Sequence, residues 1–272
     1  MSNTTVRIIS GAILVVLVGL CLYLGKNAVL VGLGVIGSLI IDEIITNFYD
    51  QRRFSLRYLF AQLFFILAFW FFNFFQISKS SFNFLISAGV LQNIFMLSYL
   101  FIIYKKSDTL LKIFRATSWG IGFFVLLPIM SLSYIIHFDG WQLYFIGLLL
   151  LNFMVDTAAY FCGKKFGKHK LWESVSPKKT IEGAIGGVFF SVLATCIYWD
   201  SLIDSVSWYT VGIFAIIACC SQVGDLFQSK LKRQFDLKDS SSLIPGHGGV
   251  YDRVDSLLFV APLFAFYLMA NF

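Results

Sequence analysis

Long apolar stretches separated by short polar segments run along the whole chain. Nine of them approach the roughly 20 residues that a helix needs to cross the hydrocarbon core of a bilayer. The pattern predicts an all-α polytopic membrane protein with about nine transmembrane helices. We predict the spans at about 6–24, 28–47, 57–76, 82–104, 118–137, 141–162, 181–199, 208–228 and 254–271.

The polar residues that could carry chemistry are concentrated late in the chain. We therefore divide it into 1–137, with spans one to five, and 138–272, with spans six to nine and the motifs described below. The first span follows Arg7 and lacks a small-x-small cleavage site, so we expect a retained helix and not a signal peptide.

Composition supports a membrane location. Hydrophobic residues make up 58% of the chain, the mean hydropathy is +0.79, and only 13% of residues are charged. A soluble domain has about 25% charged residues, so we expect no soluble domain here. The five cysteines fall mostly in spans without metal-ligand spacing, which predicts free buried thiols.

The basic residues predict the orientation. All of the 21 Lys and Arg except Lys26 and Lys79 precede the first span or follow an even-numbered span. Cytoplasmic loops carry an excess of Lys and Arg, so we expect the N-terminus and the even loops in the cytoplasm and the C-terminus outside. The net charge of +6 is then a signal of membrane topology, and we expect no nucleic-acid partner.

Six acidic residues lie inside spans or at their ends, all toward the predicted cytoplasmic side. An Asp at the bilayer centre costs about 2.5–3.5 kcal/mol on insertion scales, so such residues are expected to share a polar cavity. The alternative is separate interfacial acids, each paired with a Lys or Arg of a loop. The six are Asp42, Glu43, Asp156, Glu182, Asp225 and Asp255.

The polar stretch Ser229–Asp255 combines both signs of charge. Its basic groups suit phosphates, and its carboxylates suit Mg²⁺, which typically binds one or two carboxylates plus substrate phosphates. Asp252 and Asp255 are three residues apart, and Asp225 and Ser229 are four apart. Both spacings put oxygen atoms on one helix face. Two helix ends could therefore grip a metal ion, although an ordinary charged loop is the alternative.

Three residues in the middle of this stretch could contact a phosphate. Gly248 and Gly249 would let backbone N–H groups approach an anion closely. His247 could touch a phosphate or orient a carboxylate, although a lone histidine more often has a structural role.

A second motif, S-V-S-P-K-K-T-I-E-G, covers residues 174–183. Lys178 and Lys179 add positive charge, and Thr180 is a plausible N-cap of the seventh span. A helix N-terminus with two lysines is a reasonable anion site. The alternative is that the two lysines only anchor the cytoplasmic end of the span, which would explain the lysines but not the order of the other residues in the motif.

Three other patterns indicate packing. Gly32, Gly34 and Gly37 match a dinucleotide fingerprint in letters only, because they lie within a span and no strand precedes them. Gly183 and Gly187 form a G-x-x-x-G that suits helix contact within or between subunits. The Phe-rich third span is expected to face lipid.

The late motifs resemble the signature of the phosphatidate cytidylyltransferases, or CDP-diacylglycerol synthases. The first block contains S-x-L-K-R at 229–233, K-D at 238–239 and P-x-H-G-G-x-x-D-R-x-D at 245–255. S-P-K-K-T-x-E-G at 176–183 is similar to a second block. D-T-A-A-Y at 156–160 with F-G-K at 166–168 resembles a third, with Ala158 where relatives often have Gly. The blocks cover about the C-terminal half of the chain.

This resemblance implies a reaction. CTP and phosphatidic acid would give CDP-diacylglycerol and pyrophosphate in phospholipid biosynthesis, at the cytoplasmic side of the bacterial inner membrane. Mg²⁺ would be required, and whether a monovalent cation such as K⁺ shares the centre stays open. Family members often form dimers, so a homodimer is a further expectation.

The resemblance also implies roles for individual residues. The implied metal ligands are Asp225, Asp252 and Asp255. Catalytic or phosphate-binding cations are Lys178, Lys179, Lys232, Arg233 and Arg253. Supporting contacts to the substrates are expected from Asp156, Ser176, Thr180, Glu182, Ser229, Lys238, His247, Gly248 and Gly249.

Two alternative functions remain. One is another CTP-dependent membrane lipid enzyme, such as a polyprenol kinase or a synthase acting on archaeal ether lipids. The full run at 245–255 favours the phosphatidate enzyme. The other is an ion-coupled transporter, whose acids should lie at the membrane midplane within repeated halves. The acids here gather on one side and the sequence shows no repeat.

Overall fold

The computed structural model describes residues 3–75, 79–102, 112–113 and 115–272. The end of the predicted fourth span and Lys105 and Lys106 fall outside these residues. The helices are α1 (Asn3–Leu24), α2 (Lys26–Glu43), η1 (Ile44–Phe48, a π-helix), α3 (Leu56–Phe74), α4 (Lys79–Ile102), η2 (Ser118–Gly120, a 3₁₀ helix), α6 (Ile121–Ile135), α7 (Trp141–Phe166), α8 (Ile181–Leu202), α9 (Trp208–Gln234) and α10 (Tyr251–Asn271). The strands are β1 (Lys170–Trp172) and β2 (Ser176–Thr180).

The predicted fold class is confirmed. Within the described residues, nine helical segments are long and apolar enough to cross a membrane. Their limits agree with the predicted spans to within a few residues at most ends. The chain is thus an integral membrane protein built almost entirely of helices.

The eighth span is longer than predicted. Helix α9 continues to Gln234, so the segment from Ser229 to Arg233 is helical and the connecting loop begins later than expected. Buried Lys230 and Gln234 continue the buried face of the helix past its last acidic residue. The helix then ends where Asp236 adopts a left-handed conformation with φ 58°.

A short antiparallel hairpin interrupts the helical pattern between α7 and α8. Its strands β1 and β2 pair with Lys170 opposite Thr180. Thr180 is also the N-cap of α8, because its hydroxyl accepts a hydrogen bond from Gly183 N at 3.1 Å. The N-cap prediction is confirmed, and the lysine motif lies on strand β2.

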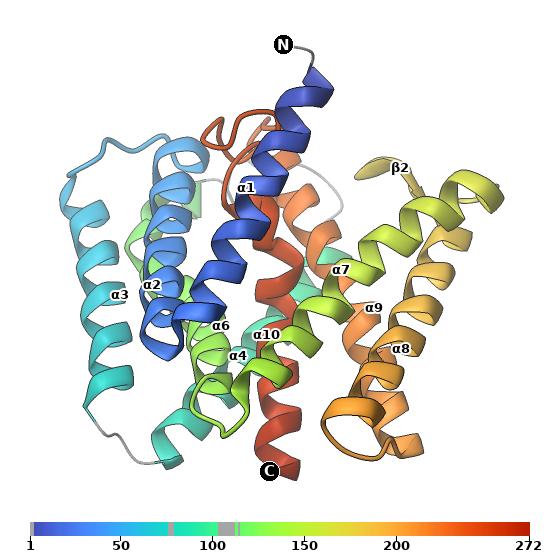
Figure 1. The fold of residues 1–272 in the computed structure, drawn as a ribbon. Coiled ribbons are helices and arrows are strands. Elements are labelled where there is room, and N and C mark those ends of the chain that lie inside the picture. The colour runs from blue at the N-terminus through green and yellow to red at the C-terminus, as the bar shows by residue number, and fades with distance from the viewer. Residues whose placement is uncertain (1–2, 76–78, 103–111, 114) are drawn as a thin grey trace.

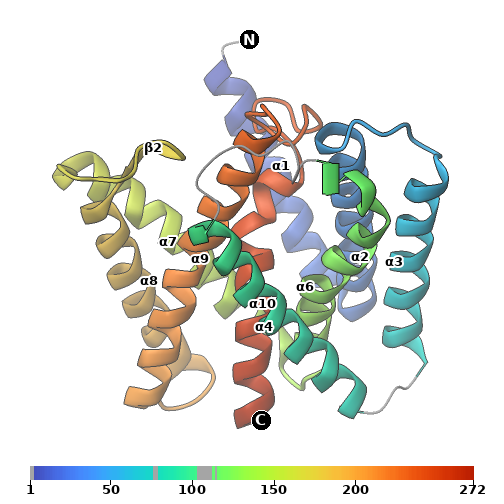
Figure 2. The ribbon, with the colours of Figure 1, turned by 180° about the vertical axis from the view of Figure 1, so that it is seen from behind.

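The helices form one bundle around α10 (Figure 1). Helix α10 is buried along most of its length and packs against α4, α6 and α9, whereas α1 lies at the periphery and is mostly exposed. The two termini lie at opposite ends of the bundle, and the α9–α10 loop and the hairpin lie at the end nearer the N-terminus. The back view shows α8 and α9 together at one edge and α3 at the other (Figure 2).

The glycine patterns do serve packing. A Cβ atom added to Gly37 would lie 2.1 Å from Phe65 Cζ, so α2 and α3 can only pack this closely with glycine there. An added Cβ on Gly187 would lie 2.8 Å from Val155 O of α7, which places the G-x-x-x-G contact within the chain. Phe65 and Phe69 are fully buried, so the third span does not use all its phenylalanines to face lipid.

Candidate functional site

The loop between α9 and α10 folds around the carboxylate of Asp252. Its Oδ2 accepts hydrogen bonds from Ser240 N (2.7 Å), Ser240 Oγ (3.0 Å) and Gly249 N (2.9 Å). Its Oδ1 accepts from Lys232 Nζ (2.8 Å) and Gln228 Nε2 (3.2 Å). The side chain of Asp252 is only 3% exposed. Asp252 therefore joins the last turns of α9, the loop and the first turn of α10.

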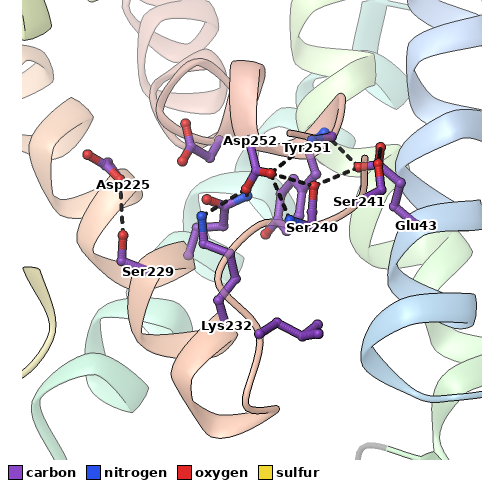
Figure 3. Close-up of polar contacts among 12 residues, drawn as sticks. Glu43, Asp225, Ser229, Lys232, Ser240, Ser241, Tyr251 and Asp252 are labelled. Atoms are coloured by element: carbon purple, nitrogen blue, oxygen red, sulfur yellow. Dashed lines mark hydrogen bonds and ion pairs between the residues drawn. The ribbon is translucent and has the colours of Figure 1, made fainter. Parts of the chain in front are cut away.

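A second buried carboxylate holds the same loop from the other half of the chain. Glu43, at the end of α2, is 2% exposed. Its Oε1 accepts from Ser241 Oγ (2.7 Å) and Val250 N (2.7 Å), and its Oε2 accepts from Ser240 Oγ (2.9 Å) and Tyr251 N (2.9 Å). The first backbone N–H groups of a helix have no partner within the helix. Glu43 accepts hydrogen bonds from two such groups at the N-terminus of α10. Figure 3 shows the connected set from Lys232 through Asp252 and Ser240 to Glu43.

The tip of the loop contacts helix α1. Gly246 O accepts a hydrogen bond from Arg7 Nε (2.9 Å), and Ser10 Oγ donates to Pro245 O (3.0 Å) and lies 2.7 Å from His247 Nδ1. Burial, together with the nearby charges of Arg253 and Arg7, lowers the pKa of His247 below its usual value. His247 is therefore neutral at neutral pH, and here it contacts α1.

Below the loop, three helices share a buried polar contact. Asn152 of α7 donates to Ser256 Oγ of α10 at 3.1 Å and accepts from Ser221 Oγ of α9 at 2.9 Å. Unpaired polar groups inside a membrane protein are costly. Sliding α7, α9 or α10 along its axis would break these hydrogen bonds, so the three side chains fix the axial positions of the helices relative to one another.

This polar contact brings three acidic residues to a similar position along the axis of the bundle. Asp156 and Asp225 lie one helical turn beyond Asn152 and Ser221, and Asp255 directly precedes Ser256. The charge of Asp225 acts on both Asp156 and Asp255, so the carboxylates lie within electrostatic reach of one another. Three of the six membrane acids therefore lie near one another, and a polar cavity shared by all six stays a prediction.

A lysine from the hairpin meets this group of carboxylates. Lys179 Nζ lies 2.5 Å from Asp225 Oδ2, and both side chains are about one-quarter to one-third exposed, at 25% and 31%. Ser229 Oγ donates to Asp225 Oδ1 at 3.3 Å (Figure 3). The two sequence motifs, 174–183 and 229–255, therefore meet at Asp225.

Lys230 fixes the hairpin from the other side. It is 5% exposed, its Nζ donates to Leu100 O of α4 at 2.5 Å, and it lies 5.2 Å from the ring centroid of Trp172 on β1. Trp172 in turn stacks on Phe101 of α4. Lys230 is a buried structural cation in this arrangement, although its sequence neighbours suggested a phosphate contact.

Two of the six acids instead form separate pairs near the ends of their helices. Asp42 pairs with Arg53, with Oδ2 and Nη2 2.7 Å apart. Glu182 accepts from the backbone N–H groups of Lys168 and His169 and lies 2.6 Å from His169 Nδ1. For Asp42, the alternative of an interfacial acid paired with a loop Lys or Arg describes the structure. Glu182 is also paired separately, but with a histidine, and a substrate contact of Glu182 stays a prediction.

The other predicted site residues lie around the same end of the bundle. Arg233 donates to Leu237 O at 3.1 Å and is exposed. Lys178, Lys238 and Arg253 are exposed, and Ser176 is half-buried on β2. Gly248 has φ +85°, which favours glycine. The N–H of Gly249 is used by Asp252, so its predicted phosphate contact would require that hydrogen bond to open.

The predicted metal ligands do not form a closed site. Within the described parts of the chain, no three His, Cys, Asp or Glu side chains are close enough together to hold a metal ion. Asp252 as a ligand stays a prediction, and it would have to give up some of its hydrogen bonds. Asp225 and Asp255 fit a hard cation better, because Mg²⁺ often takes one or two protein carboxylates and completes its shell with water and substrate phosphates.

Sequence reasoning missed several residues that build the site. Glu43 was visible as an acid at the end of a span, but its partners are about 200 residues away in sequence. Asn152 and Ser221 could have been found from their spacing, since each lies four residues before an acid that faces the same side. Ser240 lies in the loop, where nothing distinguishes it from Ser241 and Ser242.

Taken together, these features define a class of protein. It is an integral membrane protein in which two late sequence motifs gather carboxylates and lysines at one end of a helical bundle. The chain belongs to the Cytidylyltransferase family, whose sequence model matches residues 5–271. The family indicated by the signature is thereby confirmed.

Individual relatives match over shorter stretches. The chain is 45% identical over 122 residues to the phosphatidate cytidylyltransferase of Staphylococcus aureus (strain N315), covering 44% of this chain and 46% of the relative. It is 46% identical over 118 residues to the phosphatidate cytidylyltransferase of Bacillus subtilis (strain 168), covering 43% and 44%. For the phosphatidate cytidylyltransferase of Staphylococcus haemolyticus (strain JCSC1435) the values are 39% over 145 residues and 53% of each chain. In these comparisons the chain spans about half the length of the relatives it matches.

Proposed function

We propose that this protein is a phosphatidate cytidylyltransferase. It transfers the cytidylyl group of CTP to phosphatidic acid and produces CDP-diacylglycerol and pyrophosphate. The observation that carries the proposal is the family match over residues 5–271, supported by relatives that bear this name. The meeting of both motifs at the Lys179–Asp225 pair supplies a place for the reaction.

The chemistry requires little from a protein base. A phosphate oxygen of phosphatidic acid attacks the α-phosphorus of CTP, and the bond from that phosphorus to the oxygen of the β-phosphate breaks as pyrophosphate leaves. The second pKa of a phosphate monoester lies near 6, so the attacking oxygen is already deprotonated at neutral pH. The protein must position two polyanions and neutralise their charge.

Basic residues from the hairpin and the helix ends suit this task. Lys179 and Lys178 lie on β2 at the N-terminus of α8, and a helix N-terminus itself favours anions. Arg253 is exposed in the first turn of α10. We assign the phosphates of CTP and of the lipid to these side chains, and Lys179 would exchange Asp225 for phosphate when the substrates bind.

Asp225 and Asp255 would hold the Mg²⁺ ion. A bound divalent cation supplies charge neutralisation at the triphosphate. Glu43 and Asp252 fix the loop that leads into α10, where Arg253 and Asp255 lie. Asp252 would join Asp225 and Asp255 at the ion only by giving up some of these hydrogen bonds.

The placement in the cell follows from the charge distribution. We place the N-terminus and the candidate site at the cytoplasmic face of the bacterial inner membrane. The concentration of Lys and Arg before the first span and after even-numbered spans supports this orientation. CTP would enter from the cytoplasm and the lipid from the bilayer.

Two radiolabels test the proposal. Purified protein in detergent is incubated with phosphatidic acid, Mg²⁺ and CTP labelled at either the α- or the γ-phosphate. Cytidylyl transfer predicts label in the lipid product only from the α-phosphate. Label from the γ-phosphate would indicate a CTP-dependent kinase, and no labelled lipid from either substrate would reject the proposal.

A further inference from the structure

An apolar groove of about 740 Å³ runs between α8 and α9. Its volume lies within the range of about 300–1,000 Å³ that is typical of ligand pockets. The lining side chains are almost all apolar and come from both helices. They include Val188, Val192, Cys196, Ala215, Cys219 and Leu226. The two helices lie side by side at one edge of the bundle in both views (Figures 1 and 2).

One end of the groove lies at the candidate site. Leu226, which directly follows Asp225, lines it, and so does Leu171 of the hairpin strand β1. Gln222 of α9 also lines the groove near this end, and its Nε2 donates to Ala184 O of α8 at 2.8 Å. One end of the groove is therefore formed by neighbours of the Lys179–Asp225 pair, and the groove continues away from that pair along the two helices.

The groove is long enough to accompany an acyl chain through one membrane leaflet. Its lining residues extend from 184 to 196 on α8 and from 211 to 226 on α9. At 1.5 Å per residue these stretches are roughly 18 and 22 Å long, whereas half of the hydrocarbon core is about 15 Å. Ile185 and Phe189 on its rim are 65% and 61% exposed, so the groove is bordered by the lipid-facing surface of α8.

We propose that this groove binds one acyl chain of the phosphatidic acid substrate, with the lipid phosphate at Lys179. This inference rests on the proposed function and adds the binding site of the lipid tail. A ligand with one anionic end and one long apolar tail matches an apolar groove that has the Lys179–Asp225 pair near one end. A helix from a second copy of the chain would instead need apolar partners along its whole length, including beside Lys179 and Asp225.

Two groove-filling variants test the proposal. Val192→Phe on α8 and Ala215→Phe on α9 each place a ring in the groove, and Ile197→Phe is the matched control because Ile197 is 60% exposed and does not line it. Turnover is measured in mixed micelles with dioleoyl- and dihexanoyl-phosphatidic acid. We expect the KM for the dioleoyl lipid to rise about tenfold in either groove variant, because each excluded CH₂ group loses its burial. The KM values for the dihexanoyl lipid and CTP should stay within about twofold, as in the control. Equal effects on both lipids, or none, would overturn the proposal.

A crosslinking experiment gives a readout independent of activity. A phosphatidic acid carrying a diazirine in the middle of one acyl chain is photolysed with the wild-type protein, and adducts are mapped by mass spectrometry. We expect adducts within 184–196 and 211–226 that excess dioleoyl-phosphatidic acid suppresses. Adducts spread over the lipid-facing helices without competition would overturn the groove even if the enzyme is active. Competed adducts in a protein without cytidylyl transfer would instead reject the proposed function and leave a phosphatidate-binding groove.

Discussion

The carboxylate of Glu43 accepts a hydrogen bond of 2.9 Å from the backbone N–H of Tyr251, 208 residues further along the chain. This contact ties the end of α2 to the start of α10, where the signature loop ends. The same carboxylate also receives the Ser240 hydroxyl, which is shared with Asp252. The N-terminal half of the chain therefore contributes directly to the shape of the site in the C-terminal half.

Replacing Glu43 by Gln should loosen this loop. An amide has one acceptor oxygen in place of two, so some of the four donors around Glu43 lose their partner, at a cost of about 1–3 kcal/mol for each buried group. We expect a lower thermal midpoint in detergent and a loss of turnover of about tenfold or more, because small displacements of catalytic groups are costly.

The matched control for this variant is Glu173→Gln. Glu173 is exposed in the turn between β1 and β2, and substitutions at such positions usually change stability by less than about 0.5 kcal/mol. Equal stability and turnover in the Glu43 and Glu173 variants would contradict the role assigned to Glu43.

The Lys232–Asp252 pair should contribute strongly to stability. The two side chains are 12% and 3% exposed, and the atoms Nζ and Oδ1 are 2.8 Å apart. Lys232→Met leaves a buried carboxylate without its cation, which costs about 3–5 kcal/mol for such pairs. The free energy of unfolding, measured with denaturant in micelles, should fall accordingly. Arg233→Met, at the exposed next residue, should change it little, and similar losses in both variants would argue against a buried pair.

Lys179 and Lys178 should differ in catalysis. Neighbouring residues on a strand point to opposite faces, and Lys179 contacts Asp225. Lys179→Met should reduce kcat/KM by about 10²-fold, as removal of one charge-stabilising donor does in other active sites. Lys178→Met should have a smaller effect, because Lys178 is exposed on the other face of the strand. Steady-state kinetics with CTP and phosphatidic acid would show this, and a larger loss in Lys178→Met than in Lys179→Met would contradict the leading role assigned to Lys179.

Acid should loosen the contact between α1 and the loop through His247. Its lowered pKa means that the unfolded chain binds a proton more readily than the folded one. This contribution to stability is present above the usual histidine pKa of about 6.5 and is lost as the pH falls through the lowered value. The thermal midpoint of the wild type should fall on that acid side. His247→Gln should flatten the decrease, and an unchanged profile in that variant would count against this contact.

The sequence predicted the membrane fold well because lipid imposes strict length and polarity on each span. Thr180 as the N-cap of α8 and the packing glycines Gly37 and Gly187 were also predicted, since each follows from local geometry. The predicted end of the eighth span was wrong. Lys230 was taken as part of a charged loop, but it lies in α9 and is buried against Leu100 and Trp172.

The site was only partly predictable for a related reason. The pairing of Lys179 with Asp225, and of Asp252 with Ser240, depends on which helices are neighbours, and spacing along the chain does not contain that information. Glu43 shows this most clearly. From the sequence, it looked the same as its neighbour Asp42, yet Asp42 pairs with Arg53 at the edge of the bundle while Glu43 reaches the loop.

The central claim is that carboxylates from α9 and α10 share a divalent cation beside Lys179. The most direct measurement is anomalous diffraction from crystals of the protein grown with Mn²⁺ and CTP. We predict an anomalous peak within roughly 2–2.5 Å of carboxylate oxygens of both Asp225 and Asp255, which is the range for hard cations and oxygen ligands. A peak that contacts neither residue, with both carboxylates ordered and CTP bound elsewhere, would contradict the account.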